Sequence, residues 1–136
     1  VYDGIPEALR DVAAGGPMAV LTNKPVAPAR RILEALGLHT FFVEVLGGDG
    51  PLPRKPDPSG VQALRVHAPD GALLLVGDTP IDAATAAAAG VPFVLAQYGF
   101  GATRFDPARP STRYVATHAR ELPALIARAR HDHTSR

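Results

Sequence analysis

The chain has 136 residues, of which 46% are hydrophobic and 20% charged, so it is too apolar for a disordered protein and fits one globular domain. Its formal net charge of +1 argues against a basic nucleic-acid-binding face and against electrostatic attachment to a membrane. No cysteine is present, which excludes disulfides and thiolate metal sites and fits a reducing compartment. No apolar run approaches the roughly 20 residues of a transmembrane helix. The first residues do not resemble a signal peptide, so a cytoplasmic location is expected.

The first half of the chain alternates predicted helices with predicted strands. Apolar residues at helical spacing after Pro6 predict a first helix, and a short buried strand is expected over residues 18–21. Pro28 opens a second helix, and Gly37 suits the left-handed position just past its end. A second strand is expected over residues 41–46.

The second half continues this alternation. Asp57 is placed to cap a third helix that has Pro58 at its first position and reaches about His67. Thr79 and the proline after it open an alanine-rich helix that stops at Gly90. The other expected elements are strands over residues 72–76, 91–96 and 114–116, a last helix over 121–130 and a frayed tail over 131–136.

Helices and strands that alternate with short connections predict an α/β fold, in which helices cover both faces of a parallel sheet. We therefore expect a three-layer, Rossmann-like domain over residues 1–130.

The run from Leu73 to Asp82 is the most informative segment. Four apolar residues, 73–76, lead through a glycine into Asp78, and Asp82 follows four residues later. In open α/β sheets the ligand crevice lies beyond the carboxyl ends of the strands. Asp78 is therefore expected where a metal would be held, because carboxylate oxygens are suitable ligands for Mg²⁺.

Two other strand ends carry polar groups. The first strand ends in Thr22 and Asn23, which offer a hydroxyl and backbone N–H groups to a phosphoryl oxygen. The loop after the second strand carries Lys55, and Pro56 keeps it out of helical geometry. A hydroxyl, an ammonium and a carboxylate at neighbouring strand ends form a site that can stabilise the charge of a transferring phosphoryl group.

Three segments of the chain resemble the second, third and fourth motifs of the haloacid dehalogenase-like hydrolases. They are Leu21-Thr22-Asn23-Lys24-Pro25, Arg54-Lys55-Pro56-Asp57-Pro58 and Val76-Gly77-Asp78-Thr79-Pro80-Ile81-Asp82. The residue types in these segments and the spacing between them are most similar to those of the phosphoglycolate phosphatase-like members of that family. The resemblance covers nearly the whole chain and implies a Mg²⁺-dependent phosphatase of small phosphorylated metabolites.

The resemblance also implies a role for each of five residues. Thr22 would bind a phosphoryl oxygen with help from the backbone N–H of Asn23, and Lys55 would neutralise charge beside the phosphoryl group. Asp78 would ligate Mg²⁺, and Asp82 would support the metal through water or a hydrogen bond.

The first motif of the family, a strand that ends in Asp-x-Asp-Gly-Thr, does not occur in this sequence. In the family this motif supplies the nucleophile and the acid/base carboxylate. Asp3 resembles it only superficially and is interpreted as a turn residue. The chain is thus expected to be an incomplete core that lacks the cap and the central first strand, and to be inactive alone.

The missing strand would lie between the strands over residues 18–21 and 72–76. These strands must then pair directly or leave unpaired edges that invite another chain, so we expect marginal stability or self-association, together with weak Mg²⁺ binding.

Simpler interpretations stay open for each residue. Thr22 could cap the following helix, Lys55 could be solvated, and Thr79 with Asp82 could form a capping pair. For the whole chain, the alternatives to a phosphatase core are a non-catalytic phosphate- or metal-binding or interaction module, and one chain of a split phosphatase.

Overall fold

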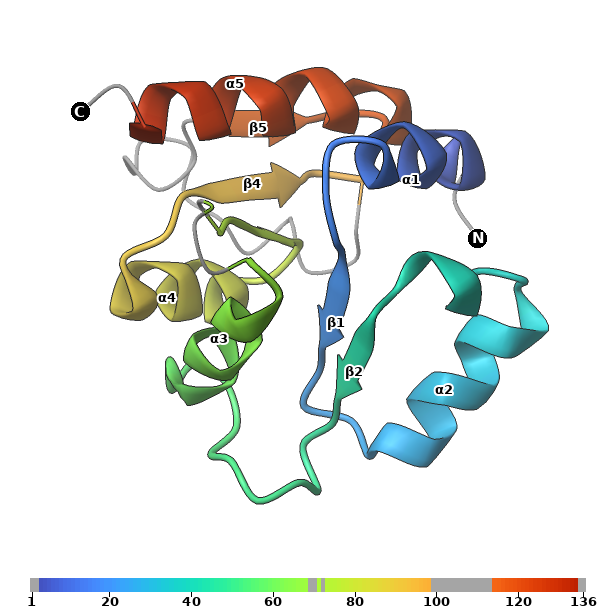
Figure 1. Cartoon of the computed structure of the whole chain (residues 1–136), viewed down its shortest axis with the longest axis vertical. Helices are drawn as coiled ribbons and strands as arrows, with labels where there is room; N and C mark the ends of the chain where they lie inside the picture. The colour runs from blue at the N-terminus through green and yellow to red at the C-terminus, as the bar shows by residue number, and fades with distance from the viewer. Residues whose placement is uncertain (1–2, 69–70, 72, 99–113, 135–136) are drawn as a thin grey trace.

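Helices and strands alternate along the chain from residue 5 to residue 96, and a further strand and helix follow from residue 114 (Figure 1). The computed structural model describes residues 3–68, 71, 73–98 and 114–134. In chain order the elements, with 3₁₀ turns written η, are α1 (Ile5–Ala13), β1 (Ala19–Leu21), α2 (Val26–Ala35), η1 (His39–Phe41), β2 (Glu44–Leu46), α3 (Ser59–Leu64), η2 (Arg65–His67), β3 (Leu75–Gly77), α4 (Pro80–Ala89), β4 (Phe93–Ala96), β5 (Tyr114–Ala116), η5 (Ala119–Glu121) and α5 (Leu122–Thr134).

The described strands form two parallel sheets. β1 pairs with β2, with Val20 opposite Val45, and the second sheet has the order β3-β4-β5, with Val76 opposite Val94. β1 and β3 do not pair with each other. Of the two outcomes expected for a missing central strand, the structure therefore shows unpaired edges.

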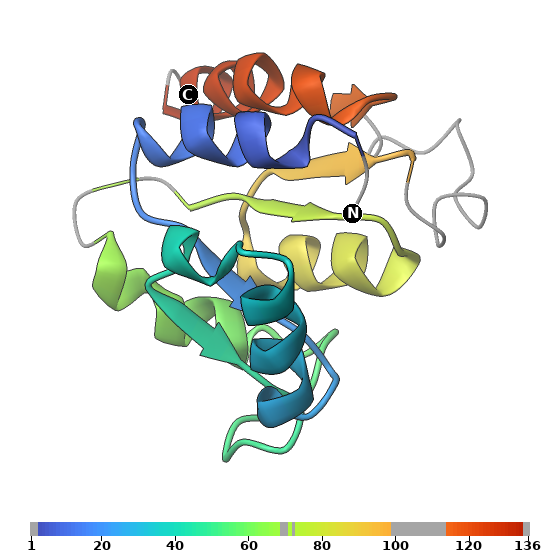
Figure 2. The same ribbon diagram turned by 90° about the vertical axis from the view of Figure 1, so that its right-hand side faces the viewer.

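The side chains of β4, which is buried on both faces, show which helices cover each face of the three-stranded sheet. Phe93 and Leu95 pack against α4, whereas Val94, between them, packs against α5. Because successive side chains of a strand point to opposite faces, α4 and α5 lie on opposite sides of the sheet. α1 contacts α5, and α3 contacts α4, so each side carries two helices (Figure 2). The predicted three-layer α/β fold is confirmed.

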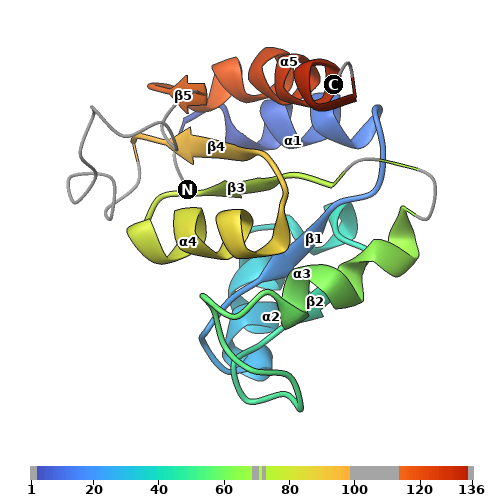
Figure 3. The same cartoon turned by 90° about the vertical axis from the view of Figure 1, so that its left-hand side faces the viewer.

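The two clusters of buried side chains in the described part of the chain both surround the three-stranded sheet. All four residues of β4 are buried, whereas all three of β1 are only half-buried and Val76 of β3 is 37% exposed. Strands inside a parallel sheet are normally covered on both faces. β1 and β3 therefore have the exposure of sheet edges, although they lie in the middle of the molecule (Figure 3).

Two strands are shorter than predicted, because the hydrogen bonds that each segment makes with adjacent parts of the chain set the residue at which strand pairing begins. The backbone N–H of Phe41 donates to the carbonyl of Leu38 in a turn, so β2 starts only at Glu44. The strand expected over residues 72–76 occupies Leu75–Gly77, since its first bond to β4 runs from the N–H of Leu75 to the carbonyl of Pro92. Residue 72 lies outside the described residues.

Two helices are longer than expected. α2 begins at Val26, two residues before Pro28. α5 continues through Thr134, into the segment expected to be a frayed tail, and the hydroxyl of Tyr114 donates to Asp132 at 2.7 Å in this last turn. Within the described ranges, no helix is long and apolar enough to cross a membrane.

Candidate functional site

Lys55 lies at the carboxyl edge of both sheets. Its Nζ donates to Asp82 Oδ1 at 2.6 Å, and the two side chains are only 13% and 9% exposed. The Lys55–Pro56 peptide bond is cis. The alternative that Lys55 is solvated is therefore wrong, because its ammonium is largely buried against a carboxylate.

Asn23 fixes the backbone of Lys55. Its Oδ1 accepts from the Lys55 N–H at 2.9 Å, and its Nδ2 donates to the Lys55 carbonyl at 3.1 Å. The segment over residues 21–25 thus holds the segment over residues 54–58 through both polar atoms of the Asn23 side-chain amide. The sequence predicted only a backbone contribution from Asn23; the side chain's role was missed, because nothing local links residues 32 positions apart.

Asp82 serves as both an ion-pair partner and a helix cap. Its Oδ2 accepts from the N–H groups of Asp78 and Thr79 at 3.2 Å and from the Thr79 hydroxyl at 2.9 Å. Thr79 Oγ1 in turn accepts from the Asp82 N–H at 3.1 Å, which completes a capping box. The predicted capping pair is confirmed.

Gly77 makes room for this arrangement. A Cβ at this position would lie 2.5 Å from the Cβ and Oδ2 of Asp82, which is far inside van der Waals contact. The glycine at the end of β3 is therefore needed for the close approach of the Asp82 carboxylate.

Asp78 follows β3 directly and lines a cavity of about 650 Å³. Among the described residues, no hydrogen bond or ion pair involves its carboxylate, whereas both oxygens of Asp82 are already used. Asp78 is therefore the carboxylate that is free to ligate a cation, and direct ligation by Asp82 would displace one of its donors.

Thr22 lies at the end of β1. Its N–H donates to the carbonyl of Leu46, and its Oγ1 accepts from the N–H of Lys24 at 3.1 Å. The hydroxyl proton is not used by these contacts, so it can be donated to a ligand. Thr22 and Lys55 both line a second cavity, of about 140 Å³, that adjoins the first at Lys55.

Contacts between neighbours connect the predicted site residues. Asn23 holds Lys55, Lys55 pairs with Asp82, and Asp82 binds the N–H of Asp78. These four residues, together with Thr22, which precedes Asn23 and lines the second cavity with Lys55, lie along one edge of the molecule, as the strand-end argument predicts. Asp3 is outside this group: its carboxylate is fully exposed, 3.8 Å from His118, in a turn as expected.

The glycine-rich segment after β2 also shapes this edge. Asp49 Oδ1 accepts from the N–H of Val26 at 2.9 Å and so caps the start of α2. A Cβ on Gly48 would lie 2.0 Å from the carbonyl oxygen of Asn23, so only glycine fits there. Neither position was predicted to have this role, although the run Gly47-Gly48-Asp49-Gly50 is typical of a close turn.

The charges of the site fit a divalent cation but do not complete its ligand set. Lys55, Asp78 and Asp82 together carry one net negative charge, which disfavours a phosphate group unless a cation is added. Within the described part of the chain, no group of three or more acidic, histidine or cysteine side chains is placed to hold a metal. Asp78 alone offers a free carboxylate, so the residues fit a weakly held Mg²⁺ whose other ligands come from water and from bound groups.

A family model described as haloacid dehalogenase-like hydrolase matches residues 1–96. A phosphoglycolate phosphatase of Rhodospirillum rubrum is 47% identical over 103 residues, which cover 74% of this chain and 43% of that protein. A phosphoglycolate phosphatase of Cereibacter sphaeroides is 38% identical over 130 residues, 94% of this chain and 58% of that protein. The solved structure of a predicted phosphoglycolate phosphatase from Haemophilus somnus matches with a TM-score of 0.80 at 28% identity, over 92% of this chain and 56% of that one.

The chain thus spans 43% to 58% of the length of the two curated relatives. The family match includes all three motif segments in their expected order. Since the fold agrees with solved members as well, the chain belongs to the haloacid dehalogenase-like hydrolases.

Proposed function

We propose that this chain provides the phosphoryl-binding part of a Mg²⁺-dependent phosphatase that acts on a small phosphorylated metabolite, with 2-phosphoglycolate as the first substrate to test. The substrate class is suggested by the relatives, which are phosphoglycolate phosphatases. A cytoplasmic location is part of the same proposal, because a chain without cysteine fits a reducing compartment.

The placement of Lys55 is the observation that carries the proposal. Asn23 holds its backbone on one side and Asp82 holds its ammonium on the other, so the charge is fixed rather than mobile. An ammonium has three donors, and the described contacts use one of them. The remaining donors can bind phosphoryl oxygens, together with the Thr22 hydroxyl at the neighbouring strand end.

Asp78 would hold the magnesium ion, which would supply positive charge beside the phosphoryl group. Asp82 keeps its capping and ion-pair contacts and so positions both Lys55 and the backbone at Asp78. The sequence lacks the Asp-x-Asp-Gly-Thr motif that carries the family's nucleophile. The 136-residue chain alone is therefore expected to bind phosphate without turning over a phosphomonoester.

Calorimetric titration of inorganic phosphate in the presence of Mg²⁺ tests this function. We expect weak binding to the unmodified chain, and binding at least tenfold weaker for Lys55→Met and for Asp78→Asn. Lys24→Met is the matched control, because it removes the chain's other lysine, which is exposed and whose ammonium makes no hydrogen bond or ion pair with the described residues. Far-UV circular dichroism checks that each variant is folded.

Two results would contradict the proposal. Unchanged phosphate binding in folded Lys55→Met and Asp78→Asn proteins would favour a plain interaction domain. Rapid hydrolysis of p-nitrophenyl phosphate by the purified chain, abolished by Asp78→Ala, would show that the chain needs no further nucleophile.

A further inference from the structure

Arg54 is a cation that has no acidic partner in the described part of the chain. It precedes Lys55, and both residues line the second cavity, of about 140 Å³. Lys55 is paired with Asp82, whereas none of the described carboxylates forms an ion pair with Arg54. Asp49, on the same loop, instead accepts from the N–H of Val26 at 2.9 Å. The positive charge of Arg54 is therefore available to a ligand.

A backbone contact fixes the guanidinium of Arg54. Its Nε donates to the carbonyl of Gly48 at 3.1 Å. Gly48 is itself held in place, because its N–H donates to the carbonyl of Lys24 at 2.7 Å and a Cβ there would collide with the carbonyl of Asn23. Arg54 thus has a defined position beside the segment that carries Thr22. A group that is already held in place loses less conformational entropy when it binds a ligand.

The free end of Arg54 is suited to a carboxylate. The side chain is exposed, and its two terminal nitrogens, Nη1 and Nη2, make no hydrogen bond with the described residues. These nitrogens offer two parallel donors, which match the two oxygens of a carboxylate. The same donors also match a phosphate, but the proposed function already gives the phosphoryl group to Thr22 and Lys55. Arg54 is therefore left for a second anionic group of the same ligand.

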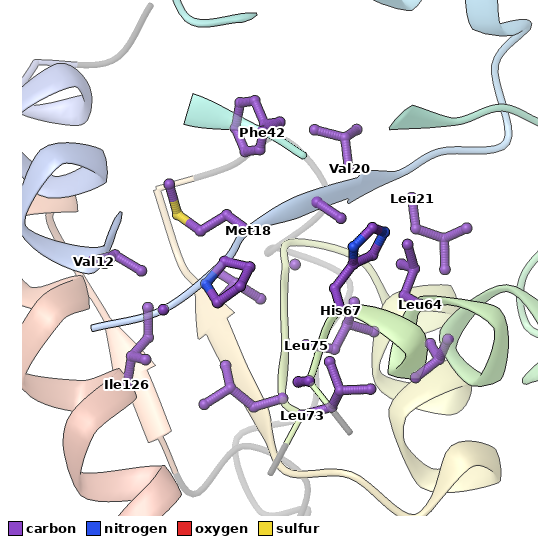
Figure 4. A pocket seen from close by; sticks show the side chains of 18 of the residues that line it. Val12, Met18, Val20, Leu21, Phe42, Leu64, His67, Leu73, Leu75 and Ile126 are labelled. Carbon is purple, nitrogen blue, oxygen red and sulfur yellow. The ribbon is translucent and has the colours of Figure 1, made fainter. Parts of the chain in front are cut away.

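The first cavity, between β1 and β3, is a poorer place for such a group. All the side chains labelled in Figure 4 are apolar except His67, which is paired with Glu44 at 2.7 Å. Arg130 also lines this cavity, but its Nη1 donates to the carbonyl of Gly15, at the amino end of β1 and so far from Lys55. A carboxylate that entered the first cavity would be surrounded mainly by apolar side chains, which is unfavourable without a partner.

We infer that Arg54 binds the carboxylate of a small phosphorylated acid whose phosphoryl group is held by Thr22 and Lys55. The inference rests on the proposed function, because it assigns the second charged group of that ligand. Arg54 and Lys55 line one cavity and their Cα atoms are about 3.8 Å apart, so one short ligand can reach both. Since Asp82 already offsets the charge of Lys55, a further negative charge on the ligand needs its own cation.

Calorimetric titration of three ligands in the presence of Mg²⁺ tests the inference on the full 136-residue chain. Inorganic phosphate has no organic group, ethyl phosphate ends in a methyl group, and 2-phosphoglycolate has a carboxylate in place of that methyl group. We expect 2-phosphoglycolate to bind at least tenfold more tightly than ethyl phosphate, because a charge-assisted pair of hydrogen bonds is added.

Arg54→Gln should remove this preference. The affinities for 2-phosphoglycolate and ethyl phosphate should become nearly equal, whereas the affinity for inorganic phosphate should stay nearly unchanged. Arg54→Lys keeps the charge without the two parallel donors, so it should retain only part of the preference. Nuclear magnetic resonance of the Arg54 Nε–H gives a second measurement: its signal should shift with 2-phosphoglycolate and far less with ethyl phosphate.

Lys24→Met is the control for general electrostatic attraction. It removes an exposed positive charge from the residue whose carbonyl accepts from Gly48, and it should leave the preference for 2-phosphoglycolate unchanged. If Lys24→Met and Arg54→Gln lowered the preference equally, the overall charge of this edge and not the Arg54 guanidinium would attract the acid. That result would overturn the inference.

The affinity for inorganic phosphate separates this inference from the proposed function. An equal loss of affinity for all three ligands in Arg54→Gln would show that Arg54 only supports the loop through Gly48. That result, or the lack of any preference for 2-phosphoglycolate in the unmodified chain, would overturn the inference and leave the proposed function in place. If the unmodified chain bound no phosphate, the proposed function would be wrong, and the inference with it.

Discussion

At the scale of single residues, Asp82 illustrates what a motif can and cannot reveal. The spacing of Thr79 and Asp82 predicted a capping pair, and the family resemblance predicted support for a metal. The structure shows the capping box and adds the buried ion pair with Lys55. The amide of Asn23 could not be predicted, because its bonds to Lys55 depend on how distant strands pack and not on local spacing.

Replacement of Asp82 should cost far more stability than replacement of Lys55. Asp82→Ala removes four hydrogen-bond contacts and leaves a largely buried ammonium unpaired, so we expect a loss of about 3–5 kcal/mol. Lys55→Met leaves the carboxylate with three donors, so we expect about 1–2 kcal/mol. Urea unfolding of each variant measures both losses.

Asp11→Ala is the control for that comparison. It removes an exposed carboxylate from α1, and such surface changes usually alter stability by less than about 0.5 kcal/mol. Equal losses for Asp82→Ala and Lys55→Met would show that the capping contacts contribute nothing beyond the ion pair.

At the scale of elements, helices with their own end residues were predicted more accurately than strands. α4 begins and ends where Thr79 and Gly90 place it, because a capping side chain and a glycine at φ 71° act locally. β2 and β3 are shorter than the apolar runs that predicted them, since the length of a strand depends on its partner. An apolar stretch of sequence does not by itself show at which residue the strand begins to pair with its neighbour.

The cap of the last helical segment should make stability depend on pH. Hydrogen bonds from the Thr117 hydroxyl, and then from the N–H groups of Thr117 and His118, hold the pKa of Glu121 below its ordinary value. A carboxyl whose pKa is lower in the folded chain stabilises it above the unfolded pKa, about 4.3 for glutamate. That contribution disappears as the pH falls through the folded pKa.

Glu121→Gln should therefore lower the urea midpoint at pH 7 and reduce the loss of stability between about pH 5 and pH 3. Glu34→Gln is the control, because Glu34 is exposed on α2 and its carboxylate accepts no hydrogen bond from the described residues. If the acid-induced loss is the same in Glu121→Gln as in the unmodified chain, the capping contacts do not set this pH dependence.

At the scale of the whole molecule, the sequence pattern predicted the α/β class and the order of the elements, and the family resemblance predicted that a central strand is missing. It could not decide between direct pairing of β1 with β3 and two separate edges, because that depends on whether the helices can close the gap. In the structure they do not, and both buried clusters surround β3, β4 and β5. The sheet formed by β1 and β2 therefore packs against fewer buried side chains than the sheet formed by β3, β4 and β5.

We expect β1 and β2 to open before the three-stranded sheet. Amide exchange at Val20 and Val45 should be at least tenfold faster than at Val94 and Leu95, since strands with few buried contacts open at lower free energy. The chain has no tryptophan, and its described tyrosines, Tyr98 and Tyr114, belong to the cluster around β4 and β5. Tyrosine fluorescence should consequently change at higher urea concentration than far-UV circular dichroism. Coincident transitions and equal exchange rates would show one cooperative unit.

Two contacts of different exposure join the parts of the molecule on either side of the cavity between β1 and β3. At the carboxyl ends of the strands, the ion pair of Lys55 and Asp82 is nearly buried. At the amino ends, Nη1 of the exposed Arg130 in α5 donates to the carbonyl of Gly15, ahead of β1, at 3.2 Å. Because water and salt compete far less with a buried ion pair than with an exposed contact, the two sheets are held together more firmly at the end that carries the site.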